Sequence, residues 1–320
     1  MKKWISRLII ACICFYCIPT TVFAADMLIP VGQVVGLELQ NNTVTVADFE
    51  EGSSAQAAGL EVGDRLISLD DHPIQNAQDV RNALDCSHGS IRVTVQRGTQ
   101  LHTIRVEPAI TADGPKLGVY LRQGVTGIGT VTYYDPSSQT FAALGHGVND
   151  SSGQLLHLTT GSVYSARVAS VRKGRSGEPG QLIGALYSKD PLGILSRNTA
   201  QGVFGKVSLP WKSQALPVAE AEDVVCGDAT ILSTVQGDTP QEYSVEILKI
   251  YPTSRQNGRN MLIRITDPTL LEITGGIVQG MSGSPIIQDG KLIGAVTHVL
   301  VNDPTTGYGI FIENMLDAAA

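Results

Sequence analysis

The sequence predicts a mainly β protein, and three observations support this fold class. The 320 residues include 34 glycines and 15 prolines, and only 5% are aromatic. Apolar residues recur in short runs between turn-forming residues, as at 203–207 and 261–265. No convincing long helix pattern occurs after about residue 116. Short strands with frequent turns are typical of β-sandwiches and barrels, and the length suggests two or three domains.

The charge balance and the cysteine content exclude several classes of protein. The chain carries 23 basic and 30 acidic residues, a net charge of −7, and has no basic run, so nucleic acid is not an expected partner. Beyond residue 25 the only cysteines are Cys86 and Cys226. They either pair with each other or remain buried free thiols. Neither a disulfide framework nor a zinc site follows from them, and no cofactor is predicted.

Residues 1–25 have the pattern of an export segment. Three basic residues, ending at Arg7, precede an apolar stretch from residue 8 to about 25. The small residues Val22 and Ala24 stand two apart at its end, as a signal peptidase requires. We predict a signal peptide or, if the segment is retained, a membrane anchor barely long enough to span a bilayer. The rest of the chain is then expected outside the cytoplasmic membrane.

Residues 29–108 predict a small binding domain. Valines and threonines alternate at 43–46 as in a half-buried strand, and a short helical turn ends at Gly59. The run 63–66 (GDRL) and a helix expected over about 77–84 follow. This pattern resembles a bacterial, circularly permuted PDZ domain.

The PDZ resemblance implies that an extended peptide binds beside a strand, with backbone amides holding its terminal carboxylate. The matching loop is Val34-Val35-Gly36-Leu37, which lacks the first glycine of the usual motif. Peptide termini are therefore predicted to bind at these four residues. A spacer domain without a free groove is the alternative.

A serine flanked by glycines is the first sign of catalytic chemistry. In the segment 280–285 (GMSGSP), Ser282 follows Gly280 by two residues and directly precedes Gly283. Glycine adopts the backbone angles of a tight loop, which can direct several amides toward one point beside the hydroxyl. Such amides stabilise the oxyanion of a tetrahedral intermediate. The pattern resembles the serine motif of chymotrypsin-like proteases, which implies Ser282 as nucleophile and the amides of Gly280 and Ser282 as the oxyanion hole.

His146 is the predicted general base. It stands between two glycines after a predicted strand, and a serine nucleophile needs a base with a pKa near neutral pH. His298, which follows the strand after the serine, is predicted to line the substrate cleft. A third group should orient the imidazole. The residues alone leave five aspartates open for that role: Asp190, Asp223, Asp228, Asp238 and Asp267.

These features together resemble peptidase family S55, the sporulation serine peptidases of endospore-forming bacteria, over nearly the whole chain. The specific stretches are 144–147 (LGHG), 277–285 (IVQGMSGSP) and 297–309 (THVLVNDPTTGYG). The resemblance implies a chymotrypsin-like double β-barrel at 109–320, after the PDZ domain. It also implies the catalytic triad His146, Asp267 and Ser282.

The resemblance further implies a signalling role. Such a peptidase is exported across the inner forespore membrane into the intermembrane space of the developing spore. It cleaves itself and the extracytoplasmic part of a membrane-bound sporulation regulator. That cleavage triggers intramembrane processing of a late sigma factor precursor. The alternatives are a quality-control protease of the HtrA type, in which the protease normally precedes the PDZ domain, and a non-catalytic PDZ adaptor.

Overall fold

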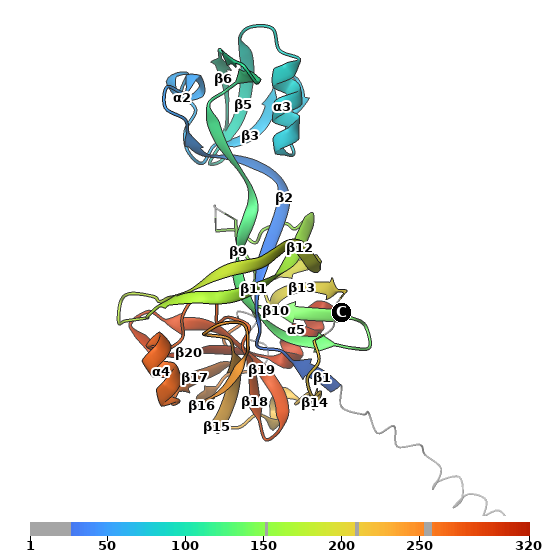
Figure 1. Ribbon diagram of the computed structural model, residues 1–320, viewed down its shortest axis with the longest axis vertical. Coiled ribbons are helices and arrows are strands. Elements are labelled where there is room, and N and C mark those ends of the chain that lie inside the picture. The colour runs from blue at the N-terminus through green and yellow to red at the C-terminus, as the bar shows by residue number, and fades with distance from the viewer. Residues whose placement is uncertain (1–26, 151–152, 209–210, 253–257) are drawn as a thin grey trace, which may run out of the picture.

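The computed structural model describes residues 27–150, 153–208, 211–252 and 258–320, which are mainly β (Figure 1). They form two β-barrels and a PDZ domain. The predicted export segment lies outside the described residues. Within them, no helix is both long and apolar enough to cross a membrane.

The first barrel closes where β2 (Val34–Phe49) and β9 (Val119–Asp135) pair with each other. Its strands, in spatial order, are β2, β9, β10 (Thr140–Ala143), β13 (Gly202–Val207), β12 (Gln181–Thr199) and β11 (Thr160–Arg172). β11 then pairs with β2, which also pairs with β9, so the ring is complete. Phe141, Leu39 and Leu156 are almost fully buried in its core. The short strands β1 (Met27–Pro30) and β14 (Leu216–Pro217) pair beside it.

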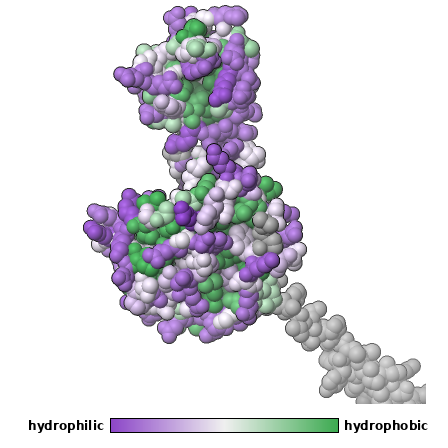
Figure 2. All heavy atoms as spheres, in the orientation of Figure 1, coloured by the Kyte–Doolittle hydropathy of each residue, from purple (hydrophilic) through white to green (hydrophobic). Residues whose placement is uncertain are grey.

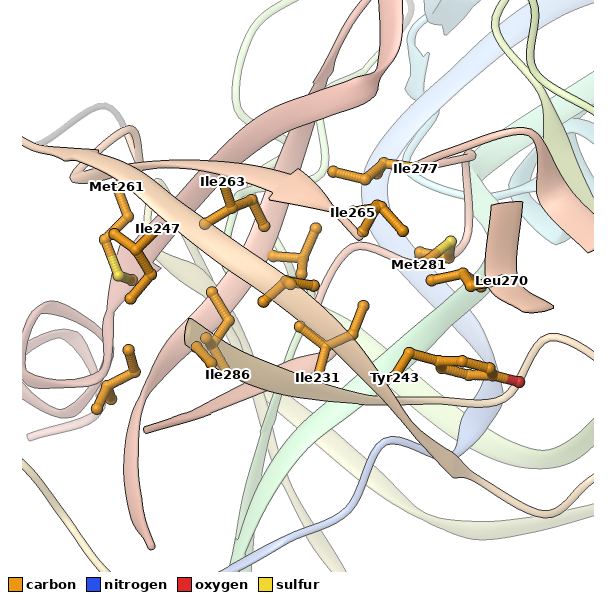
Figure 3. Close-up of a cluster of buried hydrophobic side chains, with 14 of the residues drawn as sticks. Ile231, Tyr243, Ile247, Met261, Ile263, Ile265, Leu270, Ile277, Met281 and Ile286 are labelled. Carbon is orange, nitrogen blue, oxygen red and sulfur yellow. The ribbon is translucent and has the colours of Figure 1, made fainter. Parts of the chain in front are cut away.

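The second barrel contains the serine motif. Its strands, in spatial order, are β15 (Gly227–Ser233), β16 (Gln241–Ile250), β17 (Met261–Ile265), β20 (Asp303–Phe311), β19 (Lys291–Leu300) and β18 (Pro285–Gln288). Figure 3 shows the apolar side chains of Ile231, Ile247 and Met261 in its interior. The helices η1 (Ala221–Asp223), α4 (Pro268–Thr274) and α5 (Ile312–Ala319) flank it. Two packed barrels confirm the predicted chymotrypsin-like architecture.

The PDZ domain stands apart from the barrels at the far end of β2 and β9 (Figure 1). Its own elements are α2 (Ser54–Ala57), β3 (Arg65–Leu69), β4 (His72–Pro73), α3 (Ala77–Asp85), β5 (Ile91–Arg97), β6 (Gln100–Val106), β7 (Ala109–Thr111) and β8 (Gly114–Lys116). Asn76 and Asp79 form a capping box that starts α3. The helix then buries Val80 and Leu84 against the small sheet.

The PDZ domain is inserted into the first barrel, which corrects the predicted boundaries of 29–108 and 109–320. β2 and β9 run without interruption from the barrel into the PDZ domain, and their register shifts between Leu39 and Val44. Gly124, at φ +75°, faces this shift, where a Cβ would lie 2.0 Å from the Leu39 carbonyl oxygen. The stretch 29–39 therefore belongs to the protease, although it precedes the PDZ domain in sequence.

The two cysteines neither pair nor lie buried, contrary to both sequence expectations. Cys86 and Cys226 are free and exposed. Cys86 caps the end of α3 in the PDZ domain, whereas Cys226 directly precedes β15 of the second barrel. The inserted architecture places the two residues in separate domains.

The surface is mixed in character, with separate apolar patches among polar side chains (Figure 2). Several large apolar side chains of β12 are about half exposed: Ile183, Leu186, Tyr187 and Ile194. β12 pairs with β11 over residues 181–194 but with β13 only over residues 193–199. Ile183, Leu186 and Tyr187 therefore lie on the part of β12 that pairs with a strand along one edge only, among the described residues.

Candidate active site

Three of the predicted site residues, His146, Ser282 and His298, meet in one cleft of about 490 Å³. The turn after β10 provides His146, the loop before β18 provides Ser282, and β19 provides His298. The first barrel thus supplies the histidine motif, and the second supplies the serine. Apolar side chains of β2 and β9 complete the wall of the cleft: Leu37, Leu39, Val125 and Ile128.

The serine loop has the glycine-dependent backbone that its sequence predicts. Gly280 and Gly283 adopt φ values of +100° and +98°. A Cβ on Gly283 would lie 2.0 Å from the carbonyl oxygen of Thr130 and 2.5 Å from the amide nitrogen of Leu144. Glycine is therefore required at this position for both its backbone angle and the close approach of two other segments.

The amides of Gly280 and Ser282 donate no hydrogen bond to any described residue. The carbonyls of their peptide planes, by contrast, are held in place. The Gln279 carbonyl accepts from the Leu182 amide at 2.8 Å, and the Met281 carbonyl accepts from the Ser284 amide at 3.0 Å. In a trans peptide the N–H points opposite to the C=O, so both unused donors are fixed in direction. Unused donors held in a fixed direction within the serine loop are one requirement of an oxyanion hole.

The Ser282 hydroxyl is bonded to the backbone, not to the histidine. Its Oγ donates to the Thr297 carbonyl oxygen at 2.7 Å. Ser282 is half-buried and lines the same cleft as His146. Rotation about its Cα–Cβ bond is therefore the movement that would release the hydroxyl from Thr297 and turn it into the cleft.

His146 is oriented by a backbone carbonyl. Its Nδ1 lies 2.9 Å from the carbonyl oxygen of Gly147, and since that oxygen only accepts, Nδ1 carries the proton. The other nitrogen, Nε2, is then the basic one. Burial holds the pKa of His146 below its usual value, and the bond to Gly147 offsets this shift only in part. The imidazole is therefore neutral at pH 7 and able to accept a proton.

His298 lies beside His146 in the cleft, where the sequence analysis predicted it. The two ring centroids are 5.4 Å apart. Burial, and then the charge of a protonated His146, lower the pKa of His298 to about 4. Its Nδ1 is buried without a hydrogen-bond partner among the described residues. His298 is thus a neutral, polar lining group, and its contact with substrate stays a prediction.

Asp267 is not brought to His146, which corrects the predicted triad. Asp267 is the N-cap of α4: its Oδ1 accepts from the Leu270 amide at 2.9 Å, and its Oδ2 accepts from the Ser244 amide at 3.4 Å. It does not line the cleft. No carboxylate of the described residues bonds to His146. An aspartate directly before proline is a common helix start, and that local role explains this one.

The capping role of Asp267 gives a testable expectation. Asp267→Ala should lower the free energy of unfolding by about 1 kcal/mol, because the Leu270 amide loses its acceptor. Asp267→Asn should change it by only a few tenths, because asparagine caps equally well. Denaturant titration of both variants measures the difference. If turnover of Asp267→Asn fell about 10⁴-fold at unchanged stability, the carboxylate would have to orient His146 in the working enzyme.

The predicted PDZ loop is also located elsewhere than expected. Val34, Val35, Gly36 and Leu37 lie in β2 within the first barrel. There β2 pairs with β11 along one edge and with β9 along the other, so no edge remains for a peptide. Apart from Gly36, the side chains are at least 96% buried. A strand that is buried on both faces is as apolar as a peptide-binding loop. The sequence pattern does not distinguish the two, and residues 34–37 were therefore assigned to the PDZ loop.

The structure shows a peptide-sized groove between α3 and the start of β9. Its volume is about 580 Å³, and its apolar lining includes Val80, Leu84, Leu117 and Leu121. The stretch 119–121 pairs with β2 along one edge only, among the described residues, and its other edge faces the groove. The turn Leu117-Gly118, with Gly118 at φ +70°, leads into this strand. It lies beyond residue 108, where the sequence analysis ended the domain.

Comparison with known families fits both domains. A model described as SpoIVB peptidase S55 matches residues 114–316, which is more than half of the chain. The chain belongs to the SpoIVB peptidase S55 family. A PDZ-domain model matches residues 45–97 within the inserted domain. The S55 match begins at β8, although the first barrel already begins before the insertion.

Individual relatives share shorter or more distant segments. The chain is 34% identical over 86 residues to an Agrobacterium fabrum protein classed as a zinc metalloprotease, covering 27% of this chain and 23% of that one. A Neisseria meningitidis protein of the same class is 37% identical over 75 residues, covering 23% and 17%. The chain thus spans about a fifth of these relatives. No three His, Cys, Asp or Glu side chains gather as a metal site among the described residues.

Solved structures resemble each domain at low identity. The PDZ domain of an SdrC-like protein from Listeria monocytogenes is 19% identical, with 25% of this chain and 87% of that one covered and a TM-score of 0.23. An inactive form of Rv3671c from M. tuberculosis H37Rv is 17% identical, with 59% and 78% covered and a TM-score of 0.33.

Proposed function

We propose that this S55 peptidase is an endopeptidase in which Ser282 is the nucleophile and His146 is the general base. The amides of Gly280 and Ser282 bind the oxyanion. The observation that carries this assignment is the pair of fixed, unused amides beside Ser282, in a cleft shared with His146. Both parts are needed because a serine hydroxyl attacks only when a base removes its proton and the developing charge is stabilised.

The reaction follows from these positions. The Ser282 hydroxyl leaves Thr297 and attacks the scissile carbonyl carbon while Nε2 of His146 takes its proton. The two amides stabilise the negative oxygen, and the intermediate collapses as His146 returns the proton to the leaving amine. Water then hydrolyses the acyl-enzyme by the same steps in reverse order. Gly147 keeps the imidazole in the required tautomer throughout.

A neutral carbonyl behind the histidine has an energetic consequence. A carboxylate would stabilise the imidazolium that forms during attack, whereas the Gly147 carbonyl contributes only a dipole. Burial, which lowers the pKa of His146, disfavours the imidazolium further. The enzyme should therefore turn over more slowly than one whose histidine is backed by a carboxylate.

We further propose a sporulation role. The chain is exported across the inner forespore membrane, cleaves itself, and cleaves the extracytoplasmic part of a membrane-bound regulator, which triggers intramembrane processing of a late sigma factor precursor. Membership of the SpoIVB family supports this proposal. Incubating the purified protein, with Ser282→Ala in parallel, and sequencing the fragment ends tests the self-cleavage. Fragments of the same ends from both proteins would contradict it.

The PDZ groove is proposed to hold the end of an extended peptide against residues 119–121. Arg81 of α3 is exposed and lines this groove, whereas its exposed neighbour Asn82 does not. Arg81→Glu should weaken binding of peptides with a free terminal carboxylate roughly tenfold, through like-charge repulsion. Fluorescence anisotropy with a labelled peptide library measures this effect. Asn82→Glu, with a smaller charge change on the same helix, should bind normally, and equal weakening in both variants would contradict the proposed site.

A further inference from the structure

Thr130 of β9 lies between the serine loop and the histidine loop. It is fully buried. Its Oγ1 donates to the Gly280 carbonyl at 2.7 Å, and its amide donates to the Ser282 carbonyl at 3.2 Å. Its own carbonyl accepts from the Leu144 amide at 3.2 Å. One residue of the first barrel thus contacts both catalytic loops.

The hydroxyl of Thr130 holds the carbonyl side of the peptide plane that lies between the two oxyanion donors. Leu182 holds the Gln279 carbonyl, and Ser284 holds the Met281 carbonyl. The plane between them carries the Gly280 carbonyl, which accepts from the Thr130 hydroxyl, and the Met281 amide, which donates to the Val278 carbonyl at 3.1 Å. Loss of the Thr130 hydroxyl would leave this plane held on its amide side alone. Glycine offers little resistance to rotation of this plane, because it lacks a Cβ and its φ is already positive. Rotation of this plane would displace the two oxyanion donors on either side of it.

The same residue also fixes the approach to His146. Leu144 has a φ of +72°, an uncommon conformation for a branched residue. The hydrogen bond from its amide to the Thr130 carbonyl holds this turn, two residues before His146. The position of the base relative to the oxyanion donors is therefore set through one buried residue.

We propose that Thr130 is a positioning residue for peptide hydrolysis, which acts by aligning the Gly280 and Ser282 amides with His146. This inference rests on the proposed roles of Ser282 and His146. The hydroxyl touches no substrate; its effect passes through the Gly280 carbonyl. Loss of the hydroxyl should therefore reduce stabilisation of the tetrahedral intermediate and leave substrate binding almost unchanged.

The chain offers a closely matched control on the same strand. Thr132 stands two residues further along β9 and is also fully buried. Its Oγ1 has no hydrogen-bond partner among the described residues. Thr132→Val therefore makes the same chemical change at the same depth without breaking a contact.

The experiment compares Thr130→Val, Thr130→Ser and Thr132→Val for cleavage of a peptide substrate, for inhibition by a peptide boronate, and for thermal midpoint. The serine hydroxyl adds to the boron to form a tetrahedral adduct, so inhibition reports on the oxyanion hole. Thr130→Val should lower kcat about 10- to 100-fold and weaken boronate inhibition in parallel, with KM changed less than about twofold. Thr130→Ser should retain most of the wild-type kcat and of the boronate inhibition. Thr132→Val should match the wild type in both measurements.

Several outcomes would overturn the inference. A folded Thr130→Val enzyme with normal kcat would do so, as would an equal loss in Thr132→Val. If Thr130→Val does not fold, comparison of Thr130→Ser with Thr130→Ala tests the same hydroxyl, because both variants lose the methyl group and only Thr130→Ala loses the hydroxyl. Equal activity of these two variants would overturn the inference. If the proposed role of Ser282 as nucleophile were wrong, the result would be different: Ser282→Ala would cleave the peptide at the full rate.

Discussion

Ser282→Ala is expected to lower turnover by about 10⁴-fold or more while leaving the fold intact. The variant keeps both oxyanion amides, since these belong to the backbone, and removes only the attacking oxygen. The lost bond from Oγ to the Thr297 carbonyl is a single hydrogen bond in a half-buried position, so stability should fall by about 1 kcal/mol or less. Cleavage of a quenched peptide and the thermal midpoint measure the two effects.

An exposed serine provides the control for this substitution. Ser170 lies on β11, away from the cleft, and Ser170→Ala should retain wild-type turnover. If Ser282→Ala cleaved peptide at the wild-type rate, another residue would have to be the nucleophile. The proposed mechanism would then be wrong, although the membership of the S55 family would stand.

His146→Ala is expected to have an effect of similar size, because the serine then lacks a base. In the wild type, kcat/KM should fall on the acid side as His146 becomes protonated. Since burial lowers the pKa of His146 from its usual 6.5, this fall should be centred below pH 6.5. Activity is present while the imidazole is neutral, so the enzyme should remain fully active at pH 7.

The exposed His157, outside the cleft, is the control: His157→Ala should leave both rate and pH profile unchanged. A pH–rate profile centred well above 6.5 would indicate an acidic partner that raises the pKa of the base. Together with a large loss in Asp267→Asn, that result would restore the aspartate to the triad.

The serine and histidine loops could be predicted from sequence because their chemistry is local. Gly280 and Gly283 flank Ser282, and the structure shows that both glycines have the positive φ that such a loop needs. The apolar runs of the strands were equally local, which is why a mainly β fold could be predicted, whereas the double barrel followed from the family resemblance. In each case a few neighbouring residues contain the physical reason for the structure.

Features that depend on distant segments could not be predicted. The uninterrupted course of β2 from barrel to PDZ domain has no marker other than a short polar break at 40–43, so residues 34–37 were assigned to the wrong domain. The partners of the serine loop carry no motif: Leu182 acts through its backbone amide, and Thr130 acts through its hydroxyl and its backbone. Asp267 has a motif, but its local capping role competes with the catalytic one, and in the structure the local role prevails.

The most direct test of the central claim is covalent labelling of the nucleophile. A fluorophosphonate forms a bond between its phosphorus and an activated serine oxygen, with loss of fluoride. Peptide mapping by mass spectrometry should find one phosphonate per chain, on Ser282, and none on His146→Ala at the same concentration and time. A phosphonate on another residue, or equal labelling of Ser282 in the two proteins, would contradict the assignment of Ser282 and His146 as nucleophile and base.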